Sequence, residues 1–386
     1  MPATLSDKEL LARLVAFDTT SELSNRPLVD FVAAYLDGPG VKVVTHPSPD
    51  GRKAGLVAMC GPATDPGRRD GVMLCGHTDV VPADQRAWHS DPFQLVEHQG
   101  NLVGRGTCDM KGFLALAINL MHRARHRALA RPLALLLTYD EELNTTGVRE
   151  FLATWPAERV LPRDVVVGEP TELEVVHAHK GMLDLRLDVE GAAAHSGYPH
   201  HGRNAIEPAA RAITALGTLR QELERERPAN ASTFAEVPYA ALNVGTVRGG
   251  VAVNIVPDGC TVGFSIRLLP GMDRADTVNR VQAVVEQALA QTPHRIRIVS
   301  ESPPMYTEAD ATVITDLLTL TAKSAPGTVS YATDAGWLQT AGHRCAIFGP
   351  GSITVAHKPN EYLPREQFEA AATILTRLVT RRCEAA

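Results

Sequence analysis

The sequence predicts an α/β protein: a first domain with a mostly parallel mixed sheet flanked by helices, plus an inserted α+β domain. Short β-rich runs alternate with helical patterns through the first 175 residues, and the same texture returns after about residue 298. Such alternation is typical of a parallel sheet covered by helices. At 386 residues, the chain also exceeds the size at which a single core usually stops growing, so two domains are expected.

The elements of the first domain follow from these runs. β-rich segments cover residues 55–60, 71–77, 133–140, 164–170 and 345–351, and helices are predicted near the N-terminus and from 110 to about 125. Ser6 opens the N-terminal helix, with Glu9 three positions later as in a capping box. Functional side chains of parallel sheets gather beyond the carboxyl ends of the strands. The polar residues that follow these runs are therefore the first candidates for a site.

The inserted domain begins near residue 178. The stretch "MLDLRLDVEG" alternates apolar and polar residues, as an antiparallel strand with one exposed face does. A helix at about 204–226, two more alternating strands and a helix at 274–291 complete the β-α-β-β-α-β order of a ferredoxin-like unit. We therefore place the first domain at residues 1–177 and 298–386, and the inserted domain at 178–297.

Composition excludes several classes of protein. A net charge of −6 and a pI near 6.2 give no basic footprint for nucleic acid. The apolar runs, such as 133–137, are too short to span a bilayer, and no signal peptide is recognised. The six cysteines are scattered, as is usual for reduced thiols. We expect a cytoplasmic protein that binds neither nucleic acid nor membrane.

His77 and Asp79 follow the run at 71–77, two positions apart. A lone histidine at a strand end is usually structural, and the pair also fits a capped strand end. However, a carboxylate two residues away can hold an imidazole in the tautomer that metal binding requires. The pair by itself leaves both interpretations open.

Other acidic residues occupy comparable positions. Asp109 lies between a glycine-rich turn and the predicted helix at 110, where it fits an N-cap, a cation ligand, or both. Glu141 and Glu142 follow the run at 133–140, and because strand neighbours point in different directions, one suits a metal ligand and the other a general base. Glu169 lies at the end of one further β-rich run, and His357 follows another. Together with His77, Asp109 and the glutamate pair, they provide two imidazoles, three carboxylates and one additional glutamate, and such residues suit a pair of zinc ions.

Six segments resemble those of one enzyme family: "GHTDVVP", "GRGTCDMKGF", "DEE", "GEPTE", "AHSGYP" and "HKPNEY". This dinuclear zinc family includes acetylornithine deacetylase, succinyl-diaminopimelate desuccinylase, aminoacylases and glutamate carboxypeptidases. The order and spacing fit from residue 5 to about 375, and "GEPTELEVVHAHKGML" with "FGPGSITVAHKPNEYLP" resembles the acetylornithine deacetylase branch most.

The resemblance implies a metal-dependent amidohydrolase. The implied metal ligands are His77 and Glu169 for one ion, Glu142 and His357 for the other, and Asp109 as a bridge between both. Asp79 would orient His77, and Glu141 would be the general base. The implied cofactors are two divalent ions, zinc first, although imidazole and carboxylate ligands also accept cobalt and manganese. Cys108 stands beside Asp109, and we interpret it as a buried neighbour and not a ligand.

The resemblance also gives the inserted domain a role as a lid and dimerisation domain. His195 would reach the active site of a partner subunit in a homodimer and hydrogen-bond the oxyanion, whereas the ordinary alternative is a surface histidine. Arg267 and Asn254 would hold the α-carboxylate of the substrate, a task that suits the planar fork of arginine. A structural arginine on an exposed strand is the alternative for Arg267.

The implied substrate is an N-acyl amino acid, first of all N-acetyl-L-ornithine in arginine biosynthesis. Related chemistry leaves open an N-acetyl-citrulline type of deacylase, succinyl-diaminopimelate desuccinylase, and a dipeptidase, tripeptidase or carboxypeptidase. A metal-free binding protein is a further alternative from another class. The intact set of ligand residues, together with Glu141, favours an enzyme.

Overall fold

The computed structural model describes residues 4–385 and separates them into two compact units. The first unit is built from the chain up to Ala178, from Met305–Gly327 and from Thr333 onward, and the second from His179–Pro304 with Thr328–Ala332. The predicted return to the first domain at residue 298 is too early. The last strand of the second unit runs over His294–Ser302 and stays paired with its neighbour as far as Ser302, so this unit extends to Pro304.

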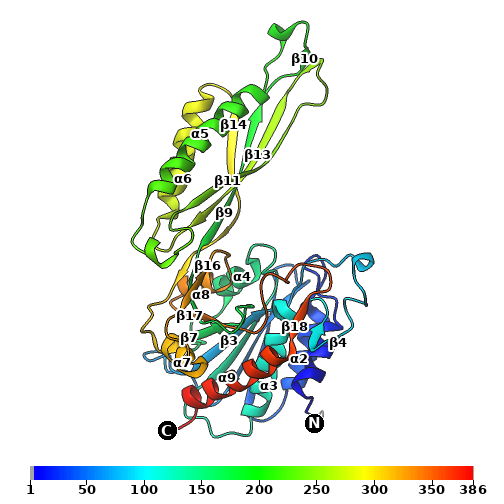
Figure 1. Ribbon diagram of the computed structural model, residues 1–386, viewed down its shortest axis with the longest axis vertical. Coiled ribbons are helices and arrows are strands. Elements are labelled where there is room, and N and C mark those ends of the chain that lie inside the picture. Colours follow the sequence, from blue (N-terminus) through cyan, green and yellow to red (C-terminus); the bar gives the residue numbers. More distant parts are fainter. Residues whose placement is uncertain (1–3, 386) are drawn as a thin grey trace. The chain divides into compact units, whose positions relative to one another are not determined.

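The first unit contains both helices and strands, with a 3₁₀ turn at Gln85–Ala87 and an irregular turn at Thr107–Lys111, and two of its strands, β8 and β16, end in residues of the second unit (Figure 1). Its helices and strands are α1 (Asp7–Val15), α2 (Arg26–Leu36), β1 (Val41–Pro47), β2 (Ala54–Cys60), β3 (Val72–His77), β4 (Val96–His98), β5 (Asn101–Val103), α3 (Gly112–Ala124), β6 (Leu133–Thr138), α4 (Thr146–Thr154), β7 (Asp164–Val167), β8 (Val176–His179), β15 (Met305–Tyr306), α7 (Thr312–Thr321), β16 (Gly327–Val329), α8 (Ala335–Thr340), β17 (Arg344–Ile347), β18 (Tyr362–Pro364) and α9 (Arg365–Cys383).

The main sheet of the first unit has the strand order β1-β2-β6-β3-β7-β17-β8-β15. Its central strands β6, β3, β7 and β17 are parallel, whereas β1 and β2 pair in antiparallel fashion. This arrangement confirms the predicted mixed α/β class. The carboxyl ends of β6, β3 and β7 lie side by side, which brings the residues that follow them to one edge of the sheet.

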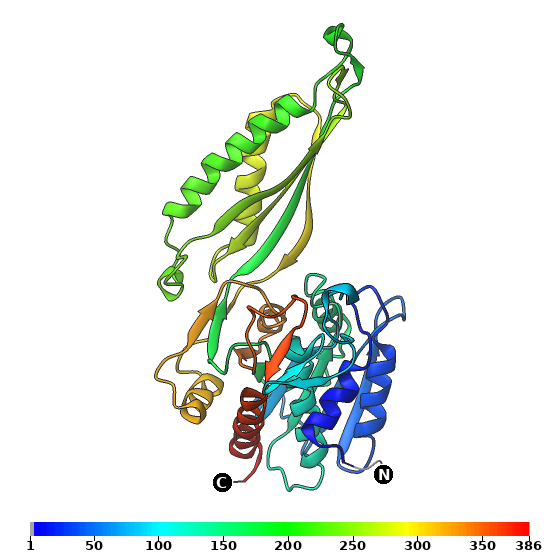
Figure 2. The ribbon, with the colours of Figure 1, turned by 45° about the vertical axis from the view of Figure 1, so that its right-hand side comes forward.

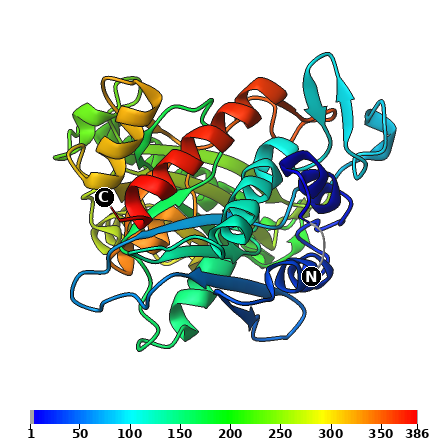
Figure 3. The same ribbon diagram turned by 90° about the horizontal axis from the view of Figure 1, so that it is seen from below.

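The central strands of the sheet are buried on both faces. Every residue of β3 and of β6 is buried, as expected of parallel strands that read as continuous apolar runs. Helices α3 and α9 pack against each other and against β3, and Figure 3 shows them side by side. Helices α4 and α8 also pack together, α4 against β6 and α8 against β17. The strand ends that carry the site therefore rest on a rigid core.

The four strands of the main sheet in the second unit and its two long helices follow the predicted β-α-β-β-α-β order, and two short strands, β10 and β12, form a separate antiparallel pair. Its elements are β9 (Gly181–Glu190), β10 (Ala194–His195), α5 (Ile206–Arg225), β11 (Ala241–Gly249), β12 (Ile255–Val256), β13 (Gly259–Leu268), α6 (Arg274–Leu289) and β14 (His294–Ser302). The antiparallel sheet has the order β11-β13-β9-β14. Helices α5 and α6 lie side by side along one face (Figure 2), where alternate residues of β9 are buried.

Helix α1 confirms the predicted capping box. The hydroxyl of Ser6 accepts the Glu9 amide at 3.2 Å, and the Glu9 carboxylate accepts the Ser6 amide at 2.7 Å.

Within residues 4–385, no helix is both long and apolar enough to cross a membrane.

His343 makes the stability of the first unit dependent on pH. Its Nδ1–H donates to the Pro162 carbonyl at 2.9 Å and its Nε2 accepts from Arg69 at 3.1 Å, so the ring is held neutral. Burial and the Arg69 charge lower the pKa of His343 from 6.5 to about 4. Because the unfolded chain binds this proton more readily, stability is full above pH 6.5 and is lost as the pH falls toward 4.

We therefore expect acidification from pH 7.5 to pH 5 to destabilise the wild type by about 2 kcal/mol more than a His343→Asn variant. Asparagine keeps a donor for Pro162 but does not titrate. The measurement is urea unfolding of both proteins at the two pH values. An equal pH dependence in both proteins would show that His343 does not contribute.

Candidate active site

Five chain segments deliver the polar residues of the candidate site. His77 is the last residue of β3, Glu141 and Glu142 follow β6, and Glu169 follows β7. Asp109 lies in the turn before α3, and His357 in the loop between β17 and β18. The parallel pairing of β6, β3 and β7 is the reason that side chains up to almost a hundred residues apart meet.

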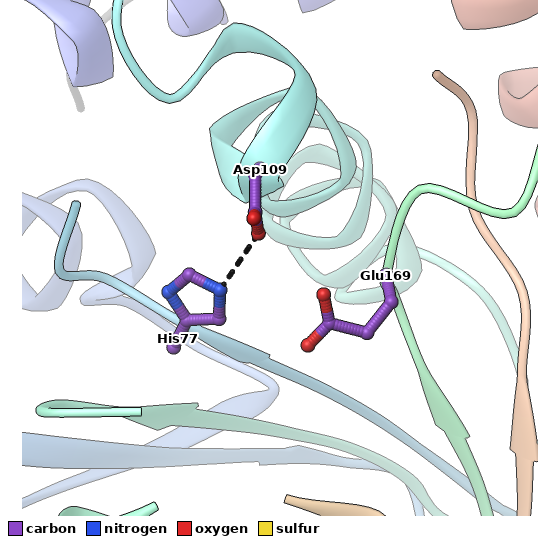
Figure 4. A group of neighbouring side chains, drawn as sticks. All are labelled: His77, Asp109 and Glu169. Atoms are coloured by element: carbon purple, nitrogen blue, oxygen red, sulfur yellow. Dashed lines mark hydrogen bonds and ion pairs between the residues drawn. The ribbon is translucent and has the colours of Figure 1, made fainter. Parts of the chain in front are cut away.

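The first donor group consists of His77, Asp109 and Glu169, whose ligand atoms all lie within 4.8 Å of one another (Figure 4). All three side chains are buried. His77 Nε2 lies 3.0 Å from Asp109 Oδ1. Oε1 of Glu169 is buried without a hydrogen-bond partner, although a buried carboxylate oxygen normally has one. An unpartnered oxygen facing an imidazole and a second carboxylate fits a cation.

The second donor group consists of Asp109, Glu142 and His357, again with ligand atoms within 4.8 Å. His357 Nε2 lies 3.2 Å from Asp109 Oδ2 and 3.0 Å from Glu142 Oε1. Asp109 thus belongs to both groups and turns a different oxygen to each histidine. A shared carboxylate of this kind is what a pair of metal ions about 4 Å apart requires.

The electrostatics of the site also favour cations. Burial raises the pKa of Glu141 and of Glu169 well above the usual value, and negative charge on Glu169 and Asp109, respectively, raises them further. Burial and the charge of Asp109 likewise raise the pKa of Glu142. Carboxylates this close in a buried site repel one another unless positive charge lies between them. The residues therefore fit two divalent ions.

Asp79 holds two parts of the site together. Its carbonyl oxygen lies 3.0 Å from His77 Nδ1, and its carboxylate lies 3.6 Å from the same nitrogen. The carboxylate oxygens accept the backbone amides of Glu141 and Glu142, each at 3.2 Å, and the Ser21 hydroxyl at 2.9 Å. The sequence predicted only the contact with His77. The structure adds that the carboxylate fixes the backbone of the two glutamates.

Replacement of Asp79 by Ala is expected to weaken metal affinity or activity by roughly 10–100-fold, as loss of an outer-sphere partner typically does. Both the His77 ring and the Glu141–Glu142 backbone lose a contact with the carboxylate. Metal titration and steady-state kinetics provide the measurement. If the Asp79→Ala variant had the metal affinity and activity of the wild type, His77 and Asp79 would form only a capped strand end.

Asp109 is not the N-cap of helix α3, which was one of the two interpretations that the sequence left open. The helix begins at Gly112, with Lys111 at its N-cap, and Asp109 has non-helical φ and ψ of −122° and 94°. The peptide bond between Asp109 and Met110 is cis. The carboxylate is therefore free of the helix terminus and faces the two histidines. Cys108 is buried, as predicted, and belongs to neither donor group.

The other three predicted residues lie in the second unit. His195 is an exposed residue of β10, where its Nδ1 accepts the Gly197 amide at 3.0 Å. Asn254 lies next to the partner strand β12, and its carbonyl accepts the Ser196 amide at 2.9 Å. Arg267 is half-buried on β13 opposite Met182, and its charge acts on Asp184. The structure thus brings His195 and Asn254 together, while Arg267 lies on a different strand pair.

Asp334 is a buried carboxylate that sequence reasoning missed. Its Oδ2 accepts the hydroxyl of Thr138, the last residue of β6, at 2.6 Å. Burial raises the pKa of Asp334 to about 6, and its charge contributes to the raised pKa of Glu141. The two partners are 196 positions apart, so no local spacing pointed to them.

A comparison with known proteins places the chain in a family. The model of peptidase family M20/M25/M40 matches residues 73–381, which is most of the chain. The chain belongs to this family. As a member of the M20/M25/M40 peptidase family it is a hydrolase of amide bonds, and this family is metal-dependent.

Relatives of this M20/M25/M40 chain agree with that placement. Acetylornithine deacetylase of Proteus mirabilis (strain HI4320) is 34% identical over 374 residues, which cover 95% of this chain and 93% of the relative. The fold resembles that of an M20 family metallo-carboxypeptidase from Sulfolobus solfataricus, with a TM-score of 0.77, 16% identity, and coverage of 97% of this chain and 98% of that one.

A further solved structure shares the fold. The YXEP protein of Bacillus subtilis, described as a dinuclear metal binding peptidase from the M20 family, matches with a TM-score of 0.68 and 14% identity, over 97% of this chain and 98% of that one. These comparisons confirm the family predicted from the six motifs.

Proposed function

We propose that this protein is an acetylornithine deacetylase-type enzyme that removes an acetyl group from an N-acyl amino acid, first of all N-acetyl-L-ornithine, in arginine biosynthesis. The observation that carries the chemistry is the pair of donor groups that share Asp109, with Glu141 beside them. The observation that favours the substrate is 34% identity to a named acetylornithine deacetylase over nearly the whole chain.

The proposed cofactors are two divalent ions, zinc first, with cobalt or manganese as alternatives that the same ligands accept. His77 and Glu169 would hold one ion, Glu142 and His357 the other, and Asp109 both. Bound ions of this kind lower the pKa of water toward 7 and polarise the acyl carbonyl.

In the proposed mechanism, Glu141 moves the proton. Its carboxylate takes a proton from the attacking water, whose oxygen forms a bond with the acyl carbon, and returns it to the amide nitrogen as the C–N bond breaks. The products are a carboxylate such as acetate and a free amino acid. Burial raises the pKa of Glu141, which makes it a stronger base than an exposed glutamate. Asp79 holds the Glu141 amide and so fixes where this base lies.

The second unit would supply the remaining contacts. His195 would donate a hydrogen bond to the oxyanion that forms as water adds to the carbonyl. Arg267 and Asn254 would hold the α-carboxylate of the substrate. We further propose that His195 acts in the site of a partner subunit of a homodimer.

The surface of the second unit supports dimerisation. β11 is an edge strand of its sheet, and Val247 on this strand is half exposed. In the segment that follows, Val251 and Val253 are 87% and 103% exposed. Apolar side chains along an unpaired edge are typical of an interface. We propose that these side chains contribute to a homodimer interface. We also propose a cytoplasmic location, since all six cysteines are free and buried.

His195→Ala is expected to reduce kcat by roughly 10²–10³-fold through loss of an oxyanion contact. An equal mixture of inactive His195→Ala and Glu141→Gln proteins, after subunit exchange, is expected to recover about a quarter of wild-type activity, because half the dimers then contain one complete site. Size-exclusion chromatography with light scattering verifies the dimer. Absence of recovery despite proven exchange would reject catalysis in trans.

The proposed function is tested with a hydrolysis panel before and after chelation. The panel contains N-acetyl-L-ornithine, N-acetyl-citrulline, other N-acetyl amino acids, N-succinyl-diaminopimelate, and several dipeptides and tripeptides. We expect the highest kcat/KM for N-acetyl-L-ornithine, loss of activity with chelator, and recovery with zinc, cobalt or manganese. A preference for a peptide would reassign the substrate, and a protein that cannot be loaded with any of these ions would reject the enzyme.

A further inference from the structure

Glu361 lies at the boundary between two segments of the site. It precedes β18 and follows the donor His357 by four positions. Its side chain is 1% exposed, and a carboxylate this deeply buried requires strong partners. Although its motif stood out in the sequence, neither the proposed mechanism nor the donor groups use this residue.

The partners of Glu361 come from the turn that carries Asp109. Oε1 accepts the backbone amides of Cys108 at 2.9 Å and of Asp109 at 3.0 Å. Oε2 accepts the Gly106 amide at 3.0 Å and the Arg105 guanidinium at 2.7 Å. The Glu361 carbonyl also accepts the Gly104 amide at 3.0 Å. One residue thus binds five donors spread over residues 104–109.

These contacts replace the hydrogen bonds that regular structure would give. Asp109 lies outside the helix and Gly106 adopts a positive φ of 78°, and the amides of Gly106, Cys108 and Asp109 have their acceptor on Glu361 instead of within the turn. Hydrogen bonds to an ionised carboxylate are about twice as strong as neutral ones. Arg105 in turn donates to the Pro82 carbonyl at 3.3 Å and stacks on Trp88 at 5.2 Å, which fixes the position of the countercharge.

We propose that Glu361 is a positioning residue that fixes the Asp109 turn to the His357 segment and so sets the spacing of the two donor groups. This inference rests on the proposed metal-dependent function. Asp109 is the residue common to both groups, and His357 belongs to the second. A substitution at Glu361 leaves the donors Asp109 and His357 in the chain but is expected to displace them. It therefore changes the affinity for metal without removing a ligand.

The test compares Glu361→Gln with a matched control, Asp164→Asn. Glutamine keeps the shape of the side chain, but its NH₂ group must face either Gly106 and Arg105 or Cys108 and Asp109, which are also donors. Asp164 is likewise 1% exposed and accepts from Arg344 and Arg382, but it lies at the start of β7, away from the carboxyl end of that strand.

The readout is zinc affinity and stoichiometry, measured by competition with a chromophoric chelator, together with the unfolding temperature of the metal-free protein. We expect Glu361→Gln to bind zinc roughly 10–100-fold more weakly than wild type while folded. We expect Asp164→Asn to unfold at a lower temperature and to bind zinc as wild type does. Equal zinc affinity in wild type and Glu361→Gln would overturn the proposal.

A second variant covers the case in which Glu361→Gln does not fold. Glu361→Asp keeps the charge opposite Arg105 but is one methylene too short to reach all four groups. It is expected to fold and to lose zinc affinity, and wild-type affinity in this variant would also overturn the proposal. Failure of the wild type itself to bind zinc, cobalt or manganese would instead reject the proposed function, so the two failures are distinguishable.

Discussion

Glu141→Gln is expected to lower kcat by roughly 10²–10⁴-fold, the range that a general base supplies. Glutamine has the same shape but cannot take a proton from water. The substitution leaves the Glu141 backbone amide on Asp79, so the neighbouring donors stay in position. Because Glu141 belongs to neither donor group, the variant should still bind two equivalents of metal. The measurements are steady-state kinetics on N-acetyl-L-ornithine and metal analysis.

Glu142→Gln is the matched comparison for this prediction. The residue is adjacent in sequence, and its backbone amide is held by the same Asp79 carboxylate. Its side chain, however, belongs to the second donor group. We expect this variant to lose metal affinity together with activity. Normal turnover in Glu141→Gln, or the same loss of metal in both variants, would contradict the assignment of Glu141 as the base.

Asp109→Ala is expected to lower kcat/KM by roughly 10³-fold or more, since bound ions supply several kcal/mol of transition-state stabilisation. Asp109 is the residue common to both donor groups, and its two oxygens face His77 and His357. Its removal therefore affects both sites at once. We expect metal analysis to show fewer than two equivalents even after incubation with excess zinc.

Cys108→Ala provides the control for Asp109→Ala. The thiol is the adjacent side chain, it is buried, and its sulfur lies 3.4 Å from the Ser352 carbonyl. Burial raises the pKa of Cys108, which disfavours the thiolate that a metal would need. This variant should bind metal and turn over like the wild type. If Cys108→Ala lost metal as Asp109→Ala does, the turn as a whole and not the carboxylate would be responsible.

Much of the fold follows from patterns that the sequence displays. The strands β3 and β6 are buried on both faces, and a continuous run of apolar residues is enough to predict such strands. The alternation in β9 likewise matches a sheet with one covered face. The end of the second unit was missed because β14 is half exposed and continues beyond the point at which its alternating pattern changes. A register shift between Ile298 and Ser300 coincides with that change.

The candidate site likewise contains residues that the sequence predicts and contacts that it does not. Residues at strand ends were predictable, because the direction of a parallel strand determines which edge its last residue reaches. The roles of Asp79 and Glu361 toward backbone amides were not predictable, since those contacts depend on the exact path of two turns. The helix start at Gly112 was missed for a related reason: the Asp109 amide in the turn at 107–111 donates to the carboxylate of Glu361, 252 positions away, and not to a helical carbonyl.

The position of β17 has a consequence for how the protein is made. This strand lies next to β7 in the main sheet, although more than 175 residues separate them, and His357 follows it. The second unit lies entirely within that interval, so during synthesis it can complete its own sheet while the first sheet still lacks β15, β16 and β17. The two donor groups cannot both form before the segment after β17 has left the ribosome. The first group, His77, Asp109 and Glu169, is complete in sequence long before that point, so only the second group depends on the late segment that carries His357.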